Sequence, residues 1–153
     1  MAMDEPLAAK AKTQEASRML QTGLKHLPDD KLAWVPMGQA KTPLLIMAEC
    51  AGALKWVASE LRGQSDPGVY ERVMQGTYTS REEVLALLAE AEAELYGAME
   101  ALTAEQLAET RQVFWGQATV GELLWTGATH TIYHAGQLNY IQTLLGDTEM
   151  HRA

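Results

Sequence analysis

Residues 119–145 read TVGELLWTGATHTIYHAGQLNYIQTLL, a run in which apolar residues recur at the spacing of one helix face. Thr119 and Glu122 have the spacing of a capping box at its start, and Gly146 follows its end. The sequence therefore predicts one long helix with a face in the core. That face contains Val120, Leu123, Gly127, His130, His134, Leu138, Ile141 and Leu145.

Two histidines, His130 and His134, lie four residues apart on this predicted buried face. A buried neutral imidazole carries one donor and one acceptor, and both need partners. Two imidazoles on consecutive turns can share a divalent metal ion, so the pair is a candidate metal site. The pattern lacks the adjacent glutamate of a zincin helix. A pair of core histidines bonded to neighbouring side chains or to water therefore stays open as the alternative.

Three more helices are expected upstream. One runs from Pro6 toward His26, and a second covers residues 43–61 after a Thr42 cap and before Arg62 and Gly63. The third begins after Ser80, which has the capping-box glutamate Glu83 three residues later, and its apolar face continues to Leu102. Four amphipathic helices predict an all-α protein.

The connections between these helices are long and contain prolines and glycines. Residues 27–41 predict an ordered crossover with one short turn, and residues 64–78 a second connection that passes over one end of the bundle. Residues 103–107 predict another short turn, and residues 113–116 an aromatic connection. No alternating β-rich run is evident. We therefore expect one domain over residues 1–153, folded as a four-helix up-and-down bundle with long crossover connections.

A third ligand candidate, Glu49, lies in the second helix on a face shared with Leu45, Gly52 and Trp56. An ionised carboxylate on such a face costs several kcal/mol unless it is paired or coordinated, and no Lys or Arg lies one turn away. If the second and fourth helices are neighbours, Glu49 completes a two-histidine, one-carboxylate set with open positions. The alternative is a slightly rotated helix that lets Glu49 reach solvent at the edge of the bundle.

Other potential ligands have simpler interpretations. Cys50 lies about 100° round the helix from Glu49 and is expected to be a small core residue. His26 is expected in solvent at a helix C-terminus, and His151 in a polar tail, so neither is favoured as a ligand.

Composition excludes several classes of partner. The net charge of −8 and a pI near 4.9 argue against nucleic acid, because no basic stripe is available for the phosphate backbone. No apolar run is long enough to span a membrane. The single cysteine excludes an internal disulfide framework, and the segment MAMDEP lacks the features of a secretory signal. We expect a cytoplasmic protein that acts on small molecules.

Four segments in order resemble the DinB/YfiT-like superfamily: Leu32–Pro36, Lys41–Cys50, Thr119–Leu124 and His130–Leu138, with HxxxHxGQ as the most specific motif. The resemblance covers nearly the whole chain. It implies a four-helix bundle, often a homodimer, that binds a divalent metal through three side chains. In many members all three ligands are histidines, whereas here the helix-two position is Glu49. A carboxylate there shifts preference from zinc toward nickel, iron or manganese, and all four stay open.

The resemblance also implies an activity. Members include thiol-dependent transferases and isomerases in which the metal activates a low-molecular-weight thiol. By analogy, a metal held by Glu49, His130 and His134 would activate a thiol cosubstrate or water for attack on an electrophilic small molecule, as a transferase or related hydrolase. Tyr133 and Gln137 are candidates to orient ligands or substrate. The alternative is a non-catalytic, metal-binding, stress-associated dimer.

Overall fold

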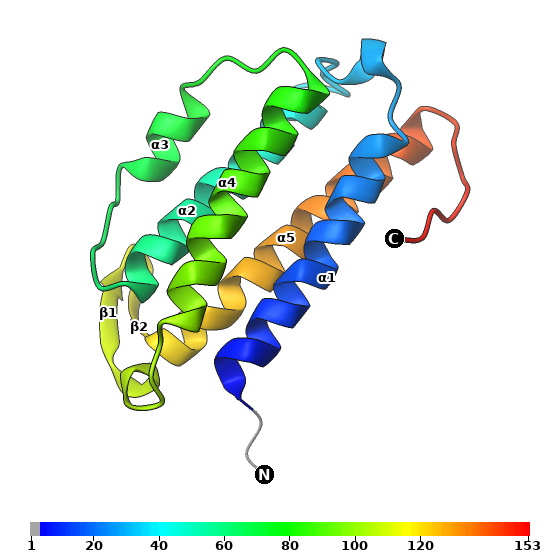
Figure 1. Cartoon of the computed structure of the whole chain (residues 1–153). Helices are drawn as coiled ribbons and strands as arrows, with labels where there is room; N and C mark the ends of the chain where they lie inside the picture. Colours follow the sequence, from blue (N-terminus) through cyan, green and yellow to red (C-terminus); the bar gives the residue numbers. More distant parts are fainter. Residues whose placement is uncertain (1–3) are drawn as a thin grey trace.

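Four long helices form the bundle in the computed structural model, which describes residues 4–153 (Figure 1). Their bounds are α1 Glu5–Lys25, α2 Pro43–Leu61, α4 Arg81–Glu100 and α5 Val120–Leu144. The all-α four-helix bundle is therefore confirmed. Residues 1–3, on which the expected absence of a secretory signal partly rests, lie outside the described residues.

Side-chain caps start three of these helices where the sequence predicts. The Thr42 hydroxyl accepts a hydrogen bond from the Leu45 amide at 3.2 Å. Ser80 and Thr119 each form a complete capping box, with Glu83 and Glu122 respectively. These local contacts satisfy amide groups that the first helical turn leaves free.

The helix directions follow from the long connections. The N-terminal halves of α1 and α5 lie together, because the Trp125 indole donates to the Glu5 carboxylate at 3.0 Å. Arg81, which opens α4, donates to the Leu27 carbonyl at 2.8 Å, beyond the last turn of α1. Thus α1 and α5 point one way and α2 and α4 the other (Figure 1). Residues 62–80 return along the length of the bundle before α4 begins, so α2 and α4 run parallel, and the helices do not alternate strictly as the up-and-down order expected from the sequence requires (Figure 1).

Gly127 of α5 lies where the four helices meet. A Cβ atom built there would come within 2.9 Å of Leu95 Cδ2 from α4, and within 3.5 Å of Leu54 Cδ2 from α2 and Thr13 Oγ1 from α1. The missing side chain lets α5 approach its three neighbours closely. This close approach brings α2 against α5 and places Glu49 near the histidines.

Two short elements in the connections differ from the sequence predictions. Residues 64–78 contain the helix α3, Val69–Met74, which packs along the side of α2 instead of over an end of the bundle. Tyr70 and Val73 of α3 pack over Gly52, where a Cβ would lie 3.4 Å from Tyr70 Cδ2 and Val73 Cβ, at the limit of an ordinary contact. Val73 is buried and Tyr70 partly so, a tertiary contact that local turn signals do not reveal.

The aromatic connection before α5 is a β-hairpin. Strands β1, Thr110–Val113, and β2, Gly116–Thr119, pair antiparallel with Thr110 opposite Thr119 and Val113 opposite Gly116. Phe114 and Trp115 form its two-residue turn, and Gly116 has a φ of 131°, which favours glycine. Four-residue strands are too short to give an alternating pattern. The other short helices are η1, Asp29–Lys31, and η2, Glu105–Ala108, where short turns were predicted.

No helix within residues 4–153 combines the length and the apolar character that crossing a membrane requires.

Candidate metal centre

The predicted ligands come from two packed helices, α2 for Glu49 and α5 for His130 and His134. His134 Nε2 lies 2.8 Å from His130 Nε2 and 3.9 Å from Glu49 Oε2. His134 is fully buried and His130 partly so. The helix geometry thus gathers the three side chains around His134, although no hydrogen bond or ion pair within the described chain joins His130 to Glu49.

Gln137 determines the tautomer of His134. Its side-chain oxygen lies 2.6 Å from His134 Nδ1, and an amide oxygen can only accept, so Nδ1 carries the proton. The lone pair of neutral His134 is then on Nε2, which accepts the hydrogen bond from His130. Tyr133 belongs to the same group through a long contact of 3.4 Å, in which the Gln137 amide donates to its hydroxyl. Such support orients metal-binding histidines in many sites.

Both histidines are held in the neutral form. Burial, with a smaller contribution from the neighbouring His134, lowers the pKa of His130 to about 4. Burial also lowers the pKa of His134, against the opposing effects of Gln137 and the Glu49 charge. Each neutral imidazole has one lone pair, on Nε2 in His134 but on Nδ1 in His130, so the Nε2 proton of His130 must shift to Nδ1 before Nε2 can bind a metal.

Glu49 has two partners that the sequence patterns did not identify, Tyr70 and Lys41. The Tyr70 hydroxyl donates to Oε1 at 2.8 Å, and the Lys41 ammonium lies 2.7 Å from Oε2. Burial is the largest influence on the Glu49 pKa and raises it. The contacts with Lys41 and Tyr70 and the nearby His134 together outweigh burial, so the pKa is lowered and the carboxylate is ionised.

Neither Lys41 nor Tyr70 lies in the same helix as Glu49, so helical spacing could not identify them. Lys41 precedes α2, in the crossover, and Tyr70 comes from α3. The burial of Glu49 explains why both are recruited: its side chain is only 14% exposed. The sequence alternative in which Glu49 simply faces solvent does not describe this environment.

The donor types, two neutral imidazoles and one carboxylate, are ones that divalent metals accept. Glu49 Oε2 is buried and makes no hydrogen bond of acceptable geometry, the Lys41 contact being an ion pair. Two nitrogen ligands at about 2.1 Å from one metal are about 3.0–3.4 Å apart, close to the 2.8 Å between the imidazoles. Glu49 Oε2 lies 3.9 Å from His134 Nε2, but the ligand atoms of the three residues do not all lie within 4.8 Å of one another, so Glu49 or His130 must move to share one metal ion. The Lys41 ammonium offsets the negative charge of Glu49, a role that a bound metal ion would share.

Two cavities flank this centre. One, of about 540 Å³, includes Glu49, Tyr70 and His130 in its lining. The other, of about 860 Å³, includes Lys41, Tyr133 and Gln137. The centre therefore has space for small molecules on two sides.

Cys50 lies in the core, as expected. Its thiol is 3.5 Å from the Thr131 hydroxyl, and burial raises its pKa to about 12. The thiol is therefore a poor nucleophile and a poor metal ligand at neutral pH.

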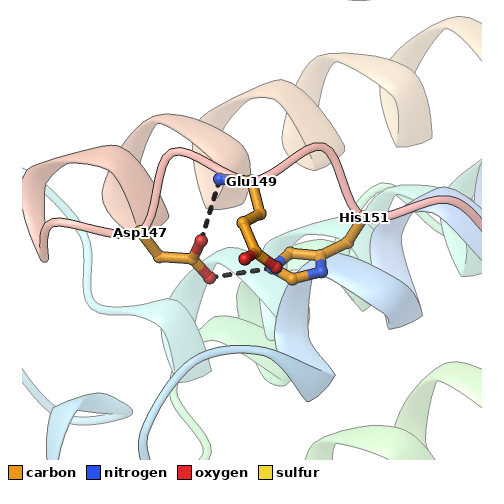
Figure 2. Close-up of side chains that lie close together, drawn as sticks. All are labelled: Asp147, Glu149 and His151. Atoms are coloured by element: carbon orange, nitrogen blue, oxygen red, sulfur yellow. Dashed lines mark hydrogen bonds and ion pairs between the residues drawn. The ribbon is translucent and has the colours of Figure 1, made fainter.

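A second group of potential ligands lies in the C-terminal tail, where no ligand was favoured. Asp147, Glu149 and His151 offer ligand atoms that all lie within 4.8 Å of one another (Figure 2). His151 Nε2 is 2.8 Å from Asp147 Oδ2, which lowers the Asp147 pKa, and the Glu149 amide donates to Asp147 Oδ1 at 3.0 Å. His26 is half-buried rather than in free solvent, because its ring stacks on His151 at 3.6 Å. These contacts fasten the tail to the end of α1.

A sequence model of the DinB superfamily matches residues 12–138, and the chain belongs to that superfamily. A conserved protein of Enterococcus faecalis has a similar crystal structure, with a TM-score of 0.78, 17% identity and coverage of 95% of this chain and 100% of that one. The four-helix bundle protein TT2238 is also similar, with a TM-score of 0.71, 24% identity and coverage of 88% and 98%. At these identities the likeness concerns the fold alone. No curated protein matches the sequence.

Proposed function

We propose that the chain is a metal-dependent enzyme. Its reaction is the transfer of a thiol to an electrophilic small molecule, or a related hydrolysis in which water takes the place of the thiol. The observation that carries the proposal is the gathering of Glu49, His130 and His134 beside two cavities, with neutral imidazoles and an ionised carboxylate. Such a set leaves coordination positions open for a substrate. Membership of the DinB superfamily supports the metal, since many members bind one.

In this proposal, a divalent ion bound by the three residues supplies Lewis-acid chemistry that lowers the pKa of a thiol or water. Gln137 holds His134 Nδ1–H and thereby aims the Nε2 lone pair at the site. Tyr70 fixes the carboxylate of Glu49 from the opposite side. Lys41 lines the larger cavity, so its ammonium can bind an anionic group of a cosubstrate there once the metal balances Glu49.

The second candidate function is a non-catalytic metal-binding bundle that forms a homodimer. It is favoured by the exposed apolar side chains around the larger cavity, which include Met37, Tyr140 and Leu144. If these residues are buried in a dimer, the larger cavity closes and cannot admit a cosubstrate.

The test is elemental analysis of untagged protein purified without chelator, followed by equilibrium dialysis against zinc, nickel, iron(II) or manganese. We expect one equivalent of metal in the native protein and in His151→Ala, which removes a ligand candidate from the tail. Glu49→Ala and His134→Ala should lose it while keeping native circular dichroism. A thiol-conjugation assay with metal-loaded protein then separates the enzyme from the second candidate.

Two results would overturn the proposal. One is a native protein that takes up none of the four metals. The other is metal that disappears from His151→Ala but persists in His134→Ala, since the ion would then occupy the tail group drawn in Figure 2.

A further inference from the structure

The smaller cavity is a trough along one face of α2. Glu49, Ala53, Trp56 and Glu60 line it at spacings of four, three and four residues, which places them on one side of the helix. Eleven residues separate the first from the last, a rise of about 16 Å. Glu49 and His130 lie toward one end of the trough, whereas Glu60 and the hairpin turn lie toward the other.

The charges that line this trough have one sign. Its carboxylates are Glu49, Glu60 and Glu71, its only histidine is the neutral His130, and its lining includes no Lys or Arg. Lys41, outside the lining, balances the charge of Glu49, so the carboxylates without an ion pair within residues 4–153 are Glu60 and Glu71, and a positively charged ligand is attracted there.

Glu60 is a buried carboxylate without a cation. The residue is 2% exposed, and its Oε1 accepts a hydrogen bond from the Ser65 hydroxyl at 2.5 Å. Its side chain forms no ion pair within residues 4–153. The nearby Arg111 guanidinium is engaged elsewhere, with the Glu60 main-chain carbonyl at 3.0 Å and the Glu109 carboxylate at 2.9 Å. A buried carboxylate that faces a cavity and lacks a cation is suited to a cationic ligand.

Aromatic rings form the wall at the same end. Trp56 of α2 meets Trp115 edge-on, with ring centroids 5.6 Å apart, and Phe114 lies 4.5 Å from Trp115. The hairpin turn holds Phe114 86% exposed and Trp115 52% exposed, although both are large and apolar. Exposed indole and phenyl faces beside carboxylates are the groups that recognise organic cations.

We propose that this trough binds a small organic cation, with its ammonium group among Trp56, Trp115 and Glu60. The site of the ammonium group does not depend on the proposed function. Only the position of the reactive group rests on it, since that group would lie at the other end of the trough, beside Glu49 and His130. The substrate class is thus an ammonium compound with its reactive group on the far side of the charge.

Three probes of nearly equal shape test the charge requirement. They are choline, its neutral analogue 3,3-dimethylbutan-1-ol and the anion 3,3-dimethylbutanoate, each titrated by calorimetry into metal-free protein. We expect choline to bind at least about fivefold more tightly than the alcohol, and the anion to show no binding, because cation–π and charge contacts each favour only the cation. Because the protein is metal-free, failure of the metal proposal does not affect this result.

Variants locate the site. Trp115→Leu keeps an apolar side chain but removes the aromatic face, and it should weaken choline at least about threefold. Glu60→Gln should do the same, and the exposed Glu71→Gln provides a second charge removal if the buried variant does not fold. The control is Glu105→Gln in η2, outside the trough, which should leave choline binding unchanged.

Equal affinity for choline and the alcohol would overturn the inference. So would an effect of Glu105→Gln as large as those of the trough variants, since this would show attraction by the overall negative charge.

Discussion

Replacing Gly127 by alanine tests the close packing that brings α2 against α5. Two effects oppose each other in this variant. Alanine is better than glycine in a helix by about 1 kcal/mol, whereas overfilling a packed core costs about 1–3 kcal/mol. The new Cβ would lie 2.9 Å from the fully buried Leu95. We therefore expect a change in unfolding free energy from roughly zero to a loss of about 2 kcal/mol.

Gly136→Ala provides the matched control. It makes the same substitution in the same helix, at a position where a Cβ meets nothing within 4 Å. This variant should gain up to about 1 kcal/mol. Because the propensity gain cancels, the difference between the two variants measures the packing cost alone, and it should be about 1–3 kcal/mol.

Urea unfolding followed by circular dichroism measures both variants against the native protein. If Gly127→Ala is as stable as Gly136→Ala, within about 0.5 kcal/mol, then α5 does not approach its neighbours as closely as described. The argument for the position of Glu49 beside the histidines would lose its packing basis.

Three further outcomes are expected. The pKa of His130 is about 4 in the folded state, against 6.5 for a free imidazole. The contribution of this neutral imidazole to the free energy of unfolding is therefore complete above pH 6.5 and is lost as the pH falls toward 4. For metal-free protein, urea unfolding should show about 2 kcal/mol of this loss between pH 6.5 and 5, and His130→Gln should reduce it. Gln137→Leu leaves His134 Nδ1–H unpaired and should weaken metal binding about 10–100-fold in dialysis, whereas Gln137→Glu should retain binding. The buried Cys50 thiol should resist a disulfide reagent at pH 8 until urea unfolds the protein, and fast labelling of native protein would contradict its burial.

The fold was largely predictable because its signals are local. Capping residues such as Ser80 and Thr119, together with apolar spacing over several turns, fix where long helices begin and which face is buried. The hairpin and α3 were not predicted, because their local sequence signals are weak. Strands of four residues carry too little periodicity, and α3 is a six-residue helix whose only buried residue, Val73, packs against Gly52 of α2.

The candidate metal centre likewise has some features that the sequence predicts and others that only tertiary packing decides. The sequence by itself determined that His130 and His134 share a face of α5, because four residues make about one helical turn. It also placed Glu49 among apolar residues of α2. Only the tertiary structure decided that Lys41 and Tyr70 reach Glu49, from a crossover and a short helix. Helical spacing reaches across one or two turns, whereas the charge balance of a buried carboxylate depends on which distant segments pack against it.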